Sequence, residues 1–447
     1  MTTRRLQIEL LAHAGRLLLE NNESTGEIHR ALTATATALG GEACHIAVSY
    51  GGVAVSLAGE GPALESVREL RYNTAVQARV HRILELVRRG VLEPATAVAC
   101  LGHVEADTRR HPRWLAVLVL GAAAASLAGL LGADAGAAAV AALATGLGLV
   151  ARQELGRRHF SLLTLPLTAA LIGAVLGGLA IRLGWTGTPE LVLIVPALML
   201  VPGPHLINGL LDLIDNYLPM SLARLGLATG ILLASALGIV LGVELTLPGP
   251  LPAEQATHAD HLSLASDIVL AGLVTCGFGV FYNTAWGQLG MAILGGMAGH
   301  GLRFLALEAG STLEAATFLG GLAVGGVSAW MARTSKTPVA VIAFAGAVTM
   351  MPGLHMYRAL AGALQLARQT GPTDSPIVGA TLGNALQACL VVSGLAVGLV
   401  FGARAVLVLT GERVPRPMSS FVYSPDKASA PGSARSWLPS RIRELPD

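Results

Sequence analysis

The chain has few charged residues for its length, and this scarcity excludes most soluble folds. Only 13% of its 447 residues are Asp, Glu, Lys or Arg, whereas 53% are hydrophobic, and the mean hydropathy is +0.61. Soluble domains carry about 25% charged residues because their surface must face water. The composition therefore indicates a membrane protein with several spans, in which much of the surface faces lipid.

An excess of one charge and a pattern of cysteines are also lacking. The formal net charge is only +2 and the basic residues lie largely outside the apolar runs, so nothing supports nucleic-acid binding. The four cysteines are scattered without CxxC or Cys/His spacing, which indicates neither a disulfide framework nor a zinc site. Nothing resembles a phosphate-binding loop, so we expect no direct use of ATP. His258, Asp260 and His261 stand in a short loop without a fourth ligand, so we expect no metal, and we expect no cofactor.

The first 110 residues differ from the rest because they hold many of the charges. Helical apolar spacing extends from Leu6 to Leu19, and Ser24-Thr25-Gly26-Glu27 is a capping-box pattern that predicts a second helix. Strands are predicted at 45–50 and 53–57, and further helices at 74–89 and 94–108. We therefore expect residues 1–110 to form a small cytoplasmic α+β domain that is retained rather than cleaved.

Four polar residues at the start of that second helix raise the possibility of a hydrolase: Ser24, Thr25, Glu27 and His29. Residues of these types at a helix start are more often caps. We therefore interpret residues 1–110 as a regulatory or gating domain, with a structural scaffold as the alternative, and we do not expect an enzyme.

From Trp114 onward, apolar runs follow one another at lengths near the roughly 20 residues that cross a bilayer. Ten spans are predicted, at 114–132, 135–151, 160–182, 189–202, 222–246, 264–283, 286–301, 312–332, 337–352 and 377–400. The predicted fold is an α-helical polytopic membrane protein with two inverted five-helix modules, residues 111–248 and 249–410. Residues 411–447 are rich in Ser, Pro and Arg, and are predicted to be a disordered cytoplasmic tail.

One short phrase occurs twice, inside two of these apolar runs. Val201-Pro202-Gly203-Pro204-His205-Leu206 recurs as Met351-Pro352-Gly353-Leu354-His355-Met356, with each residue shifted by 150. The first and sixth spans, which start at Trp114 and near Leu264, are related by the same offset. Pro and Gly break a helix, and such a break in a bilayer needs protein or a water-filled cavity around it. Breaks at corresponding places in two halves are typical of a transporter's binding site.

Basic residues orient the predicted bundle. Arg152 to Arg158, Arg333 to Lys336 and Arg404 to Arg413 lie on one side of a ten-span chain, together with Arg109-Arg110. Basic segments mark the cytoplasmic side, so both termini are predicted to be cytoplasmic. Five spans in each half also require the second half to be inverted relative to the first, as in carriers that work by alternating access.

The sequence around the two breaks resembles the threonine/serine exporter family. Leu200 to Asp212, which reads LVPGPHLINGLLD and continues to Ser221-Leu-Ala-Arg224, is similar to the signature of its first module. Thr337-Pro338 through Met351-Pro352-Gly353 to Tyr357-Arg358 resembles the second module. The resemblance covers residues from about 8 to 402, and it implies two fused modules that some bacteria make as separate proteins. It further implies export of threonine and serine across the bacterial inner membrane, driven by the proton motive force. Some two-protein relatives suggest export of dicarboxylates such as succinate as the alternative.

Polar residues follow the first break at helical spacing. Asn208, Asp212 and Asp215 stand at i, i+4 and i+7 and form one polar stripe among apolar neighbours. A carboxylate at membrane depth would pair with a substrate ammonium or carry the coupling proton. The alternative is an amphipathic helix at the interface with its polar face in water. We favour a functional Asp212, because it also matches the family signature.

The helix amides after Gly203 and Gly353 are predicted to receive the substrate carboxylate, with a plain kink as the alternative. His205 and His355 hold equivalent positions and are predicted to relay protons, unless they are structural. Arg358 would supply the positive charge that a dicarboxylate needs, and Arg224 is expected to anchor at the headgroups rather than neutralise Asp212. The predicted substrate site is Pro202, Gly203, His205, Asn208, Asp212, Pro352, Gly353, His355 and Arg358, with Asp212, His205 and His355 as proton carriers.

Other polar residues in the spans receive structural interpretations. Asp267 and Glu314 are expected at the membrane interface. His300 is a candidate proton carrier like His205 and His355, but a less favoured one. Asn384 and Gln387 would either line the pathway or hydrogen-bond a neighbouring helix. The expected partners are a small amino acid, protons, membrane lipids and, in a homo-oligomer, further copies of the chain.

Overall fold

The computed structural model describes residues 3–40, 44–57, 60–107, 110–247, 262–335, 339–368 and 375–411. The predicted tail at 411–447 lies outside these residues apart from Gly411, and so does most of the loop at 247–263.

Within the described residues up to 107, four helices and three strands form what we call the N-terminal unit. They are α1 (Thr3–Glu20), α2 (Thr25–Ala38), β1 (Cys44–Ser49), β2 (Gly52–Leu57), β3 (Ala63–Ser66), α3 (Thr74–Arg88) and α4 (Pro94–Ala106). The strands pair antiparallel in the order β1-β2-β3. The helices and strands predicted in this part are confirmed within a few residues. The short β3 is an addition, because four residues give too brief an alternation to predict a strand.

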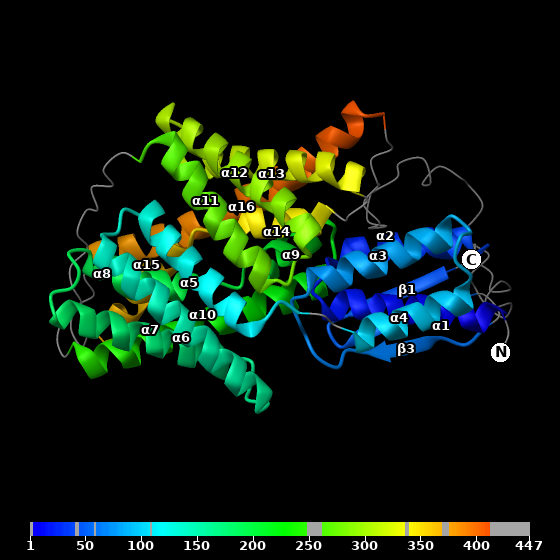
Figure 1. Cartoon of the computed structure of the whole chain (residues 1–447), viewed down its shortest axis with the longest axis horizontal. Helices are drawn as coiled ribbons and strands as arrows, with labels where there is room; N and C mark the ends of the chain where they lie inside the picture. The colour runs from blue at the N-terminus through cyan, green and yellow to red at the C-terminus, as the bar shows by residue number, and fades with distance from the viewer. Residues whose placement is uncertain are drawn as a thin grey trace, which may run out of the picture.

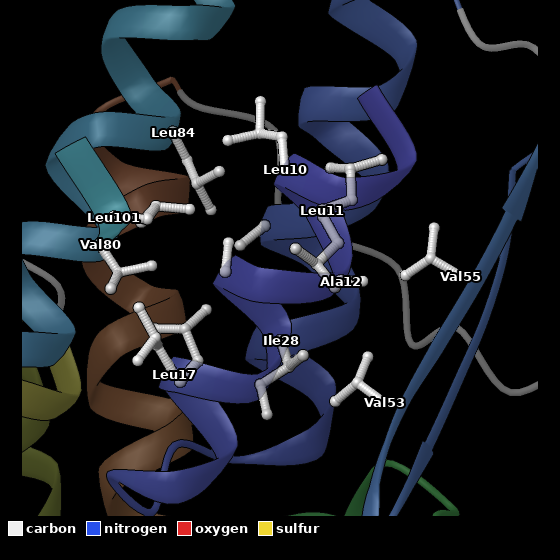
Figure 2. Close-up of a cluster of buried hydrophobic side chains, with 14 of the residues drawn as sticks. Leu10, Leu11, Ala12, Leu17, Ile28, Val53, Val55, Val80, Leu84 and Leu101 are labelled. Atoms are coloured by element: carbon white, nitrogen blue, oxygen red, sulfur yellow. The ribbon is translucent and has the colours of Figure 1, made fainter. Parts of the chain in front are cut away.

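The core of the N-terminal unit lies between its sheet and its helices. Val53 and Val55 of β2 point toward α1 and α2, where they meet Leu11 and Ile28 (Figure 2). All four side chains are fully buried. Burial of such side chains stabilises a fold by about 1.5–3 kcal/mol each, so this unit has a hydrophobic core of its own.

Eight helices of the described residues are long and apolar enough to cross a membrane. They are α5 (Arg113–Leu130), α6 (Ala135–Arg157), α7 (Thr164–Arg182), α10 (Leu218–Thr246), α11 (Leu264–Phe281), α12 (Trp286–Glu308), α13 (Leu313–Ser335) and α16 (Ser375–Leu409). Each corresponds to one of the predicted spans. In Figure 1 these helices lie beside the blue N-terminal unit along the long axis of the molecule.

The two predicted spans at 189–202 and 337–352 each contain one short helix and the break that follows it. Each short helix is the first member of a bent pair, α8 (Pro189–Leu198) with α9 (Gly203–Ile214), and α14 (Val339–Val348) with α15 (Gly353–Arg368). The pairs bend by 62° and 56° at the Pro-Gly phrases. A helix of ten residues is about 15 Å long, roughly half of the hydrocarbon core, so neither α8 nor α14 crosses it alone. If each bent pair counts as one span, the described residues contain up to ten spans.

The helices repeat in order and in packing. Pro189 and Val339 begin α8 and α14, and Gly203 and Gly353 begin α9 and α15, so both pairs of starts are 150 residues apart. In the first half α8 packs on α6 and α7, and α7 packs on α10. The second half has the same neighbours, with α14 on α12 and α13, and α13 on α16. In Figure 1, α8 and α15 lie far from the N-terminal unit, whereas α9 and α14 lie near it.

Glycines allow the closest of these helix contacts. A Cβ atom at Gly402 of α16 would collide with the backbone oxygen of Leu322 in α13, and one at Gly398 would collide with that of Phe318. Small residues are common where membrane helices approach closely, since no side chain separates the two backbones. The α13–α16 contact therefore depends on glycine at these positions.

We expect Gly402→Ala to lower the stability of the full chain by about 1–3 kcal/mol, because the added methyl group overpacks the interface. The measurement is thermal unfolding in detergent. Gly383→Ala, on the same helix, is the matched control, because a Cβ atom there meets nothing within 4 Å. Equal melting temperatures for the two variants would contradict the proposed packing role.

Candidate functional site

The two Pro-Gly breaks lie against each other. A Cβ atom at Gly203 would come within 2.9 Å of Cγ2 of Val348, the last residue of α14. One at Gly353 would come within 2.7 Å of Cδ2 of Leu198, the last residue of α8. Each glycine thus allows the start of a helix in one half to approach the end of a helix in the other. The structure in this way brings together Pro202, Gly203, Pro352 and Gly353 of the predicted site.

A cavity of about 370 Å³ adjoins this crossing on the side of the second break, and we call it the large cavity. The break contributes the residues from Val348 to His355 to its lining. The amides at the start of α15 have no partners within the helix and carry its positive dipole end. The volume lies in the range of about 300–1,000 Å³ that is typical of small-molecule sites.

Four ionisable side chains from α11 and α12 line the same cavity: Asp267, His300, Arg303 and Glu308. Asp267 Oδ2 lies 2.6 Å from His300 Nδ1, and these residues are only 6% and 5% exposed. Arg303, one turn further along α12, donates from Nε to Oγ1 of Thr317 at 3.2 Å. The large cavity therefore presents an acid, a base and a cation to the same space.

Asp267 lies in the first turn of α11 and is buried among protein side chains, and its expected place at the membrane interface stays a prediction. Sequence reasoning gave His300 little weight and did not include Arg303 in the site. The available signal for His300 was its position inside an apolar span, since ionisable residues there are costly and are functional by default.

The remaining predicted residues near the second break have partners in the protein. His355 Nδ1 lies 2.8 Å from Asn384 Oδ1. Arg358 donates to both carboxylate oxygens of Glu190, at 3.0 and 3.3 Å. Gln387 donates to Glu314 at 2.8 Å, so Asn384 and Gln387 both bond neighbouring helices. Of these residues, only His355 also lines the large cavity.

Asp212 is completely buried where α9 meets the N-terminal unit. Its Oδ1 accepts a hydrogen bond from the amide of Thr25 at 2.8 Å, and its Oδ2 accepts one from the Thr25 hydroxyl at 3.0 Å. The same Oδ2 lies 3.0 Å from Nε of Arg224, which is 2% exposed. The expectation that Arg224 anchors at lipid headgroups is therefore wrong, and it pairs with Asp212 instead.

Other residues of α9 and α10 hold the loop between α1 and α2. The Asn208 amide donates to the carbonyl of Asn22 at 2.6 Å. Arg224 donates to Oδ1 of Asn22 at 2.8 Å and to the carbonyl of Glu23. We call Asp212, Arg224 and Asn208, with the loop at 22–25, the interdomain clamp. Two residues of the predicted polar stripe thus bind protein in this structure, and a contact of Asp212 with substrate stays a prediction.

The four polar residues that suggested a hydrolase are engaged in the same region. The Ser24 hydroxyl caps α2 by accepting from the Glu27 amide at 3.3 Å, as the capping pattern predicted. Glu27 pairs with Arg30 at 2.8 Å. His29 stacks on Tyr217 at 5.1 Å between ring centroids. With Thr25 bound to Asp212, the group serves helix capping and docking rather than a nucleophile with its base.

The loop between α11 and α12 makes a second contact with the N-terminal unit. The Thr74 amide donates to the carbonyl of Tyr282 at 3.0 Å. Asn283 donates to Oδ1 of Asn73 at 2.8 Å and accepts from the amide of His111 at 2.8 Å. The N-terminal unit is therefore fixed to both halves of the membrane part.

His81 gives the interdomain clamp a pH dependence. Its Nε2 lies 3.2 Å from Oε2 of Glu23, which is fully buried. Burial alone would lower the pKa of His81, but the hydrogen bond and charge of Glu23, with Glu27, outweigh both burial and Arg88 and raise it. Because the pKa of His81 is higher in the folded than in the unfolded protein, its pairing with Glu23 stabilises the fold fully at a pH below the unfolded-state pKa of about 6.5. This stabilisation is lost as the pH rises through the folded-state pKa.

We therefore expect the melting temperature of the full chain to fall as the pH rises from about 6.5 toward the raised pKa of His81. The variant His81→Gln should lack the part of this decrease in melting temperature that His81 causes. The variant His103→Gln, at an exposed position on α4, should show the same decrease as the wild type. Identical pH profiles for the wild type and His81→Gln would contradict this role.

The fold and these contacts define the class of protein. In the part of the chain that the structure describes, eight to ten apolar spans and two crossed helix breaks with a cavity beside them define a polytopic helical membrane protein. A family model described as "Putative threonine/serine exporter" (ThrE) matches residues 9–246, more than half of the chain. A second, described as "Threonine/Serine exporter, ThrE" (ThrE_2), matches residues 267–404. The chain belongs to the threonine/serine exporter family, in the form that fuses both modules. No solved structure matches the chain.

Proposed function

We propose that this protein exports threonine, serine or a similar small amino acid in exchange for protons, through the large cavity. The observation that carries the proposal is the position of Asp267, His300 and Arg303 in one cavity, beside the amide end of α15. An amino acid has one positive and one negative group, and this cavity offers a counterpart to each. Membership of an exporter family supports the direction of transport.

The substrate carboxylate would bind Arg303 and the first amides of α15. Guanidinium groups bind carboxylates with two parallel hydrogen bonds, and a helix start favours an anion. The substrate ammonium would bind Asp267. Both ends would then be held by charge-assisted hydrogen bonds, which are about twice as strong as neutral ones.

Proton exchange would follow from competition for Asp267. The carboxylate is hydrogen-bonded to His300, so the pair can hold a proton that the arriving ammonium displaces. Because the proton and the ammonium compete for the same oxygens, the loaded and proton-bound states exclude each other, as antiport requires. Asp212, His205 and His355 remain proposed additional proton carriers.

The repeat supports a mechanism of alternating access. We propose that the two halves are inverted relative to each other, and that α8–α9 and α14–α15 change their bends to open opposite sides in turn. The N-terminal unit would be cytoplasmic in a bacterial inner membrane, and the interdomain clamp would connect it to the moving α9. Membrane lipids and a homo-oligomer remain proposed partners.

The dicarboxylate alternative relied on Arg358, together with protonated His205 and His355, to provide a compensating positive charge. Arg358 is instead neutralised by Glu190 in a two-oxygen contact. We therefore propose the amino acid and not the dicarboxylate.

Competition experiments test the substrate class in proteoliposomes loaded with labelled threonine. Unlabelled threonine and serine should compete for efflux, because they carry both charged groups. Threonine methyl ester lacks the carboxylate and 3-hydroxybutyrate lacks the ammonium, so each should compete at least about tenfold less well, as expected when a charged hydrogen bond is lost. Efflux in which succinate competes as well as threonine would contradict the proposal.

A further inference from the structure

A second, smaller cavity lies beside the first break, on the side of the N-terminal unit. It measures about 70 Å³, and we call it the small cavity. Its lining includes Pro202 and His205 of the break, Arg152 of α6 and Tyr282 after α11. The N-terminal unit contributes Tyr72, whose ring meets the His205 ring edge-on at 5.4 Å between centroids.

The small cavity is the counterpart of the large cavity in the internal repeat. Helices α6 and α12 begin at Ala135 and Trp286, which are 151 residues apart, and Arg152 and Arg303 are separated by the same 151. His205 and His355 are separated by 150, like the breaks that carry them. Each cavity therefore has one arginine from the equivalent turn of an equivalent helix, one Pro-Gly break and the histidine that follows this break, and the large cavity has His300 in addition.

The polar groups of the small cavity have hydrogen-bonding capacity that the described residues do not use. His205 is 4% exposed, and its Nδ1 has no hydrogen-bond partner among them. The Arg152 guanidinium lies 5.4 Å from the centre of the Phe281 ring, and no ion pair of Arg152 occurs in the described part of the chain. The described lining contains no Asp or Glu. A half-buried cation with no acid beside it favours an anionic ligand, and the Nδ1 of the buried His205 ring can add a hydrogen bond in the tautomer that carries its proton there.

We propose that the small cavity is a second binding site for the substrate carboxylate, used when the protein is open toward the N-terminal unit. Arg152 would bind the carboxylate there, as Arg303 does in the large cavity, and His205 would provide a further hydrogen bond. The inference rests on the proposed function and deepens it. It also explains the unequal volumes of about 70 and 370 Å³, since alternating access enlarges one of two equivalent sites while the other is closed.

The test measures half-saturation from each face separately. Membrane vesicles of both orientations carry the full chain, and labelled threonine is supplied from the N-terminal-unit face or from the opposite face. Arg152→Gln should raise the half-saturating concentration by about 10- to 100-fold on the first face, the factor expected when a charged hydrogen bond is lost. On the opposite face, the half-saturating concentration of Arg152→Gln should stay within about twofold of the wild-type value. Arg303→Gln should raise the half-saturating concentration on the opposite face and leave it nearly unchanged on the N-terminal-unit face.

Two further variants separate ligand binding from folding. Arg152→Lys keeps the charge but not the planar fork of donors, so it should fold and show a smaller rise on the same face. Arg157→Gln is the matched control, because this arginine is on the same helix with its side chain 65% exposed. It should leave the half-saturating concentration unchanged on both faces. If Arg152→Gln does not fold, the one-sided rise in Arg152→Lys decides the question.

The proposal is overturned if Arg152→Gln folds and leaves half-saturation on the N-terminal-unit face unchanged. It is also overturned if Arg152→Gln and Arg303→Gln each raise the half-saturating concentration equally on both faces, because that result means that one shared site serves both faces. A second measurement separates this inference from the proposed function. Threonine, but not its methyl ester, should raise the melting temperature of the solubilised full chain, and Arg152→Gln should reduce that rise. This binding result would support the carboxylate site even if the wild type transported no threonine, and its absence in a folded wild type would overturn it.

Discussion

Replacing Asp212 by Ala is expected to destabilise the full chain by about 3–5 kcal/mol, the usual cost of removing one partner from a buried ion pair. Arg224 would keep its charge at 2% exposure without its carboxylate, and the Thr25 amide and hydroxyl would lose their acceptor. The loss should appear as a lower melting temperature in detergent. Limited proteolysis should also cut more readily between the N-terminal unit and α5, because the interdomain clamp holds that unit in place.

The control for Asp212→Ala is Arg404→Ala. The Arg404 side chain is 38% exposed and lies 4.0 Å from Asp215, a long and partly solvated pair that is worth about 0–1 kcal/mol. A double-mutant cycle of Asp212→Ala and Arg224→Ala should give a coupling energy of about 0.5–3 kcal/mol, the range for residues in direct contact. Additive effects of the two substitutions, or an Asp212→Ala variant as stable as the control, would contradict the clamp.

Asp267→Asn is expected to lower proton-driven threonine efflux by at least about 30-fold, because removal of a buried charged partner costs about 2–5 kcal/mol. Asparagine keeps the shape of the side chain and can still bond His300. It cannot attract the substrate ammonium or hold a proton that the ammonium displaces. The residual efflux should therefore respond little to a pH gradient, whereas the wild type should respond strongly.

Glu314→Gln provides the comparison for Asp267→Asn. Glu314 lies in the first turn of α13, accepts a hydrogen bond from Gln387, and is not among the residues that line the large cavity. This variant should retain gradient-stimulated efflux. Equal loss in both variants would mean that any acid in these spans is needed for assembly, and it would contradict a specific role for Asp267.

Much of the fold was predictable from the sequence because membrane spans depend on local composition. Apolar runs of sufficient length gave eight helices near their observed positions, and Pro202-Gly203 and Pro352-Gly353 marked the two breaks. The bends of 62° and 56° were not predictable, because the angle at a break depends on what packs around it. Gly203 lies close to Val348 and Gly353 lies close to Leu198, and both of these approaches are made between the two halves.

The site was less predictable, because its contacts join distant parts of the chain. Asp212 was identified as important from its position after the break, but its partner Thr25 is 187 residues away and in a different unit. Asp267 and His300 are 33 residues apart on neighbouring helices, and their contact depends on the rotation of both helices. The equivalence of Arg152 and Arg303 was accessible from the repeat, but only after the start of each helix was known.

The most direct test of the central claim is threonine efflux from proteoliposomes with and without an imposed pH gradient. Wild type, Asp267→Asn and Asp212→Asn would be compared at equal reconstitution. Gradient-stimulated efflux in the wild type that is lost in Asp267→Asn would support a proton-coupled amino-acid exporter with its site in the large cavity. Loss of coupling in Asp212→Asn, with the fold intact, would add that residue to the proton carriers. Well-reconstituted wild-type protein with no threonine flux under either condition would contradict the account.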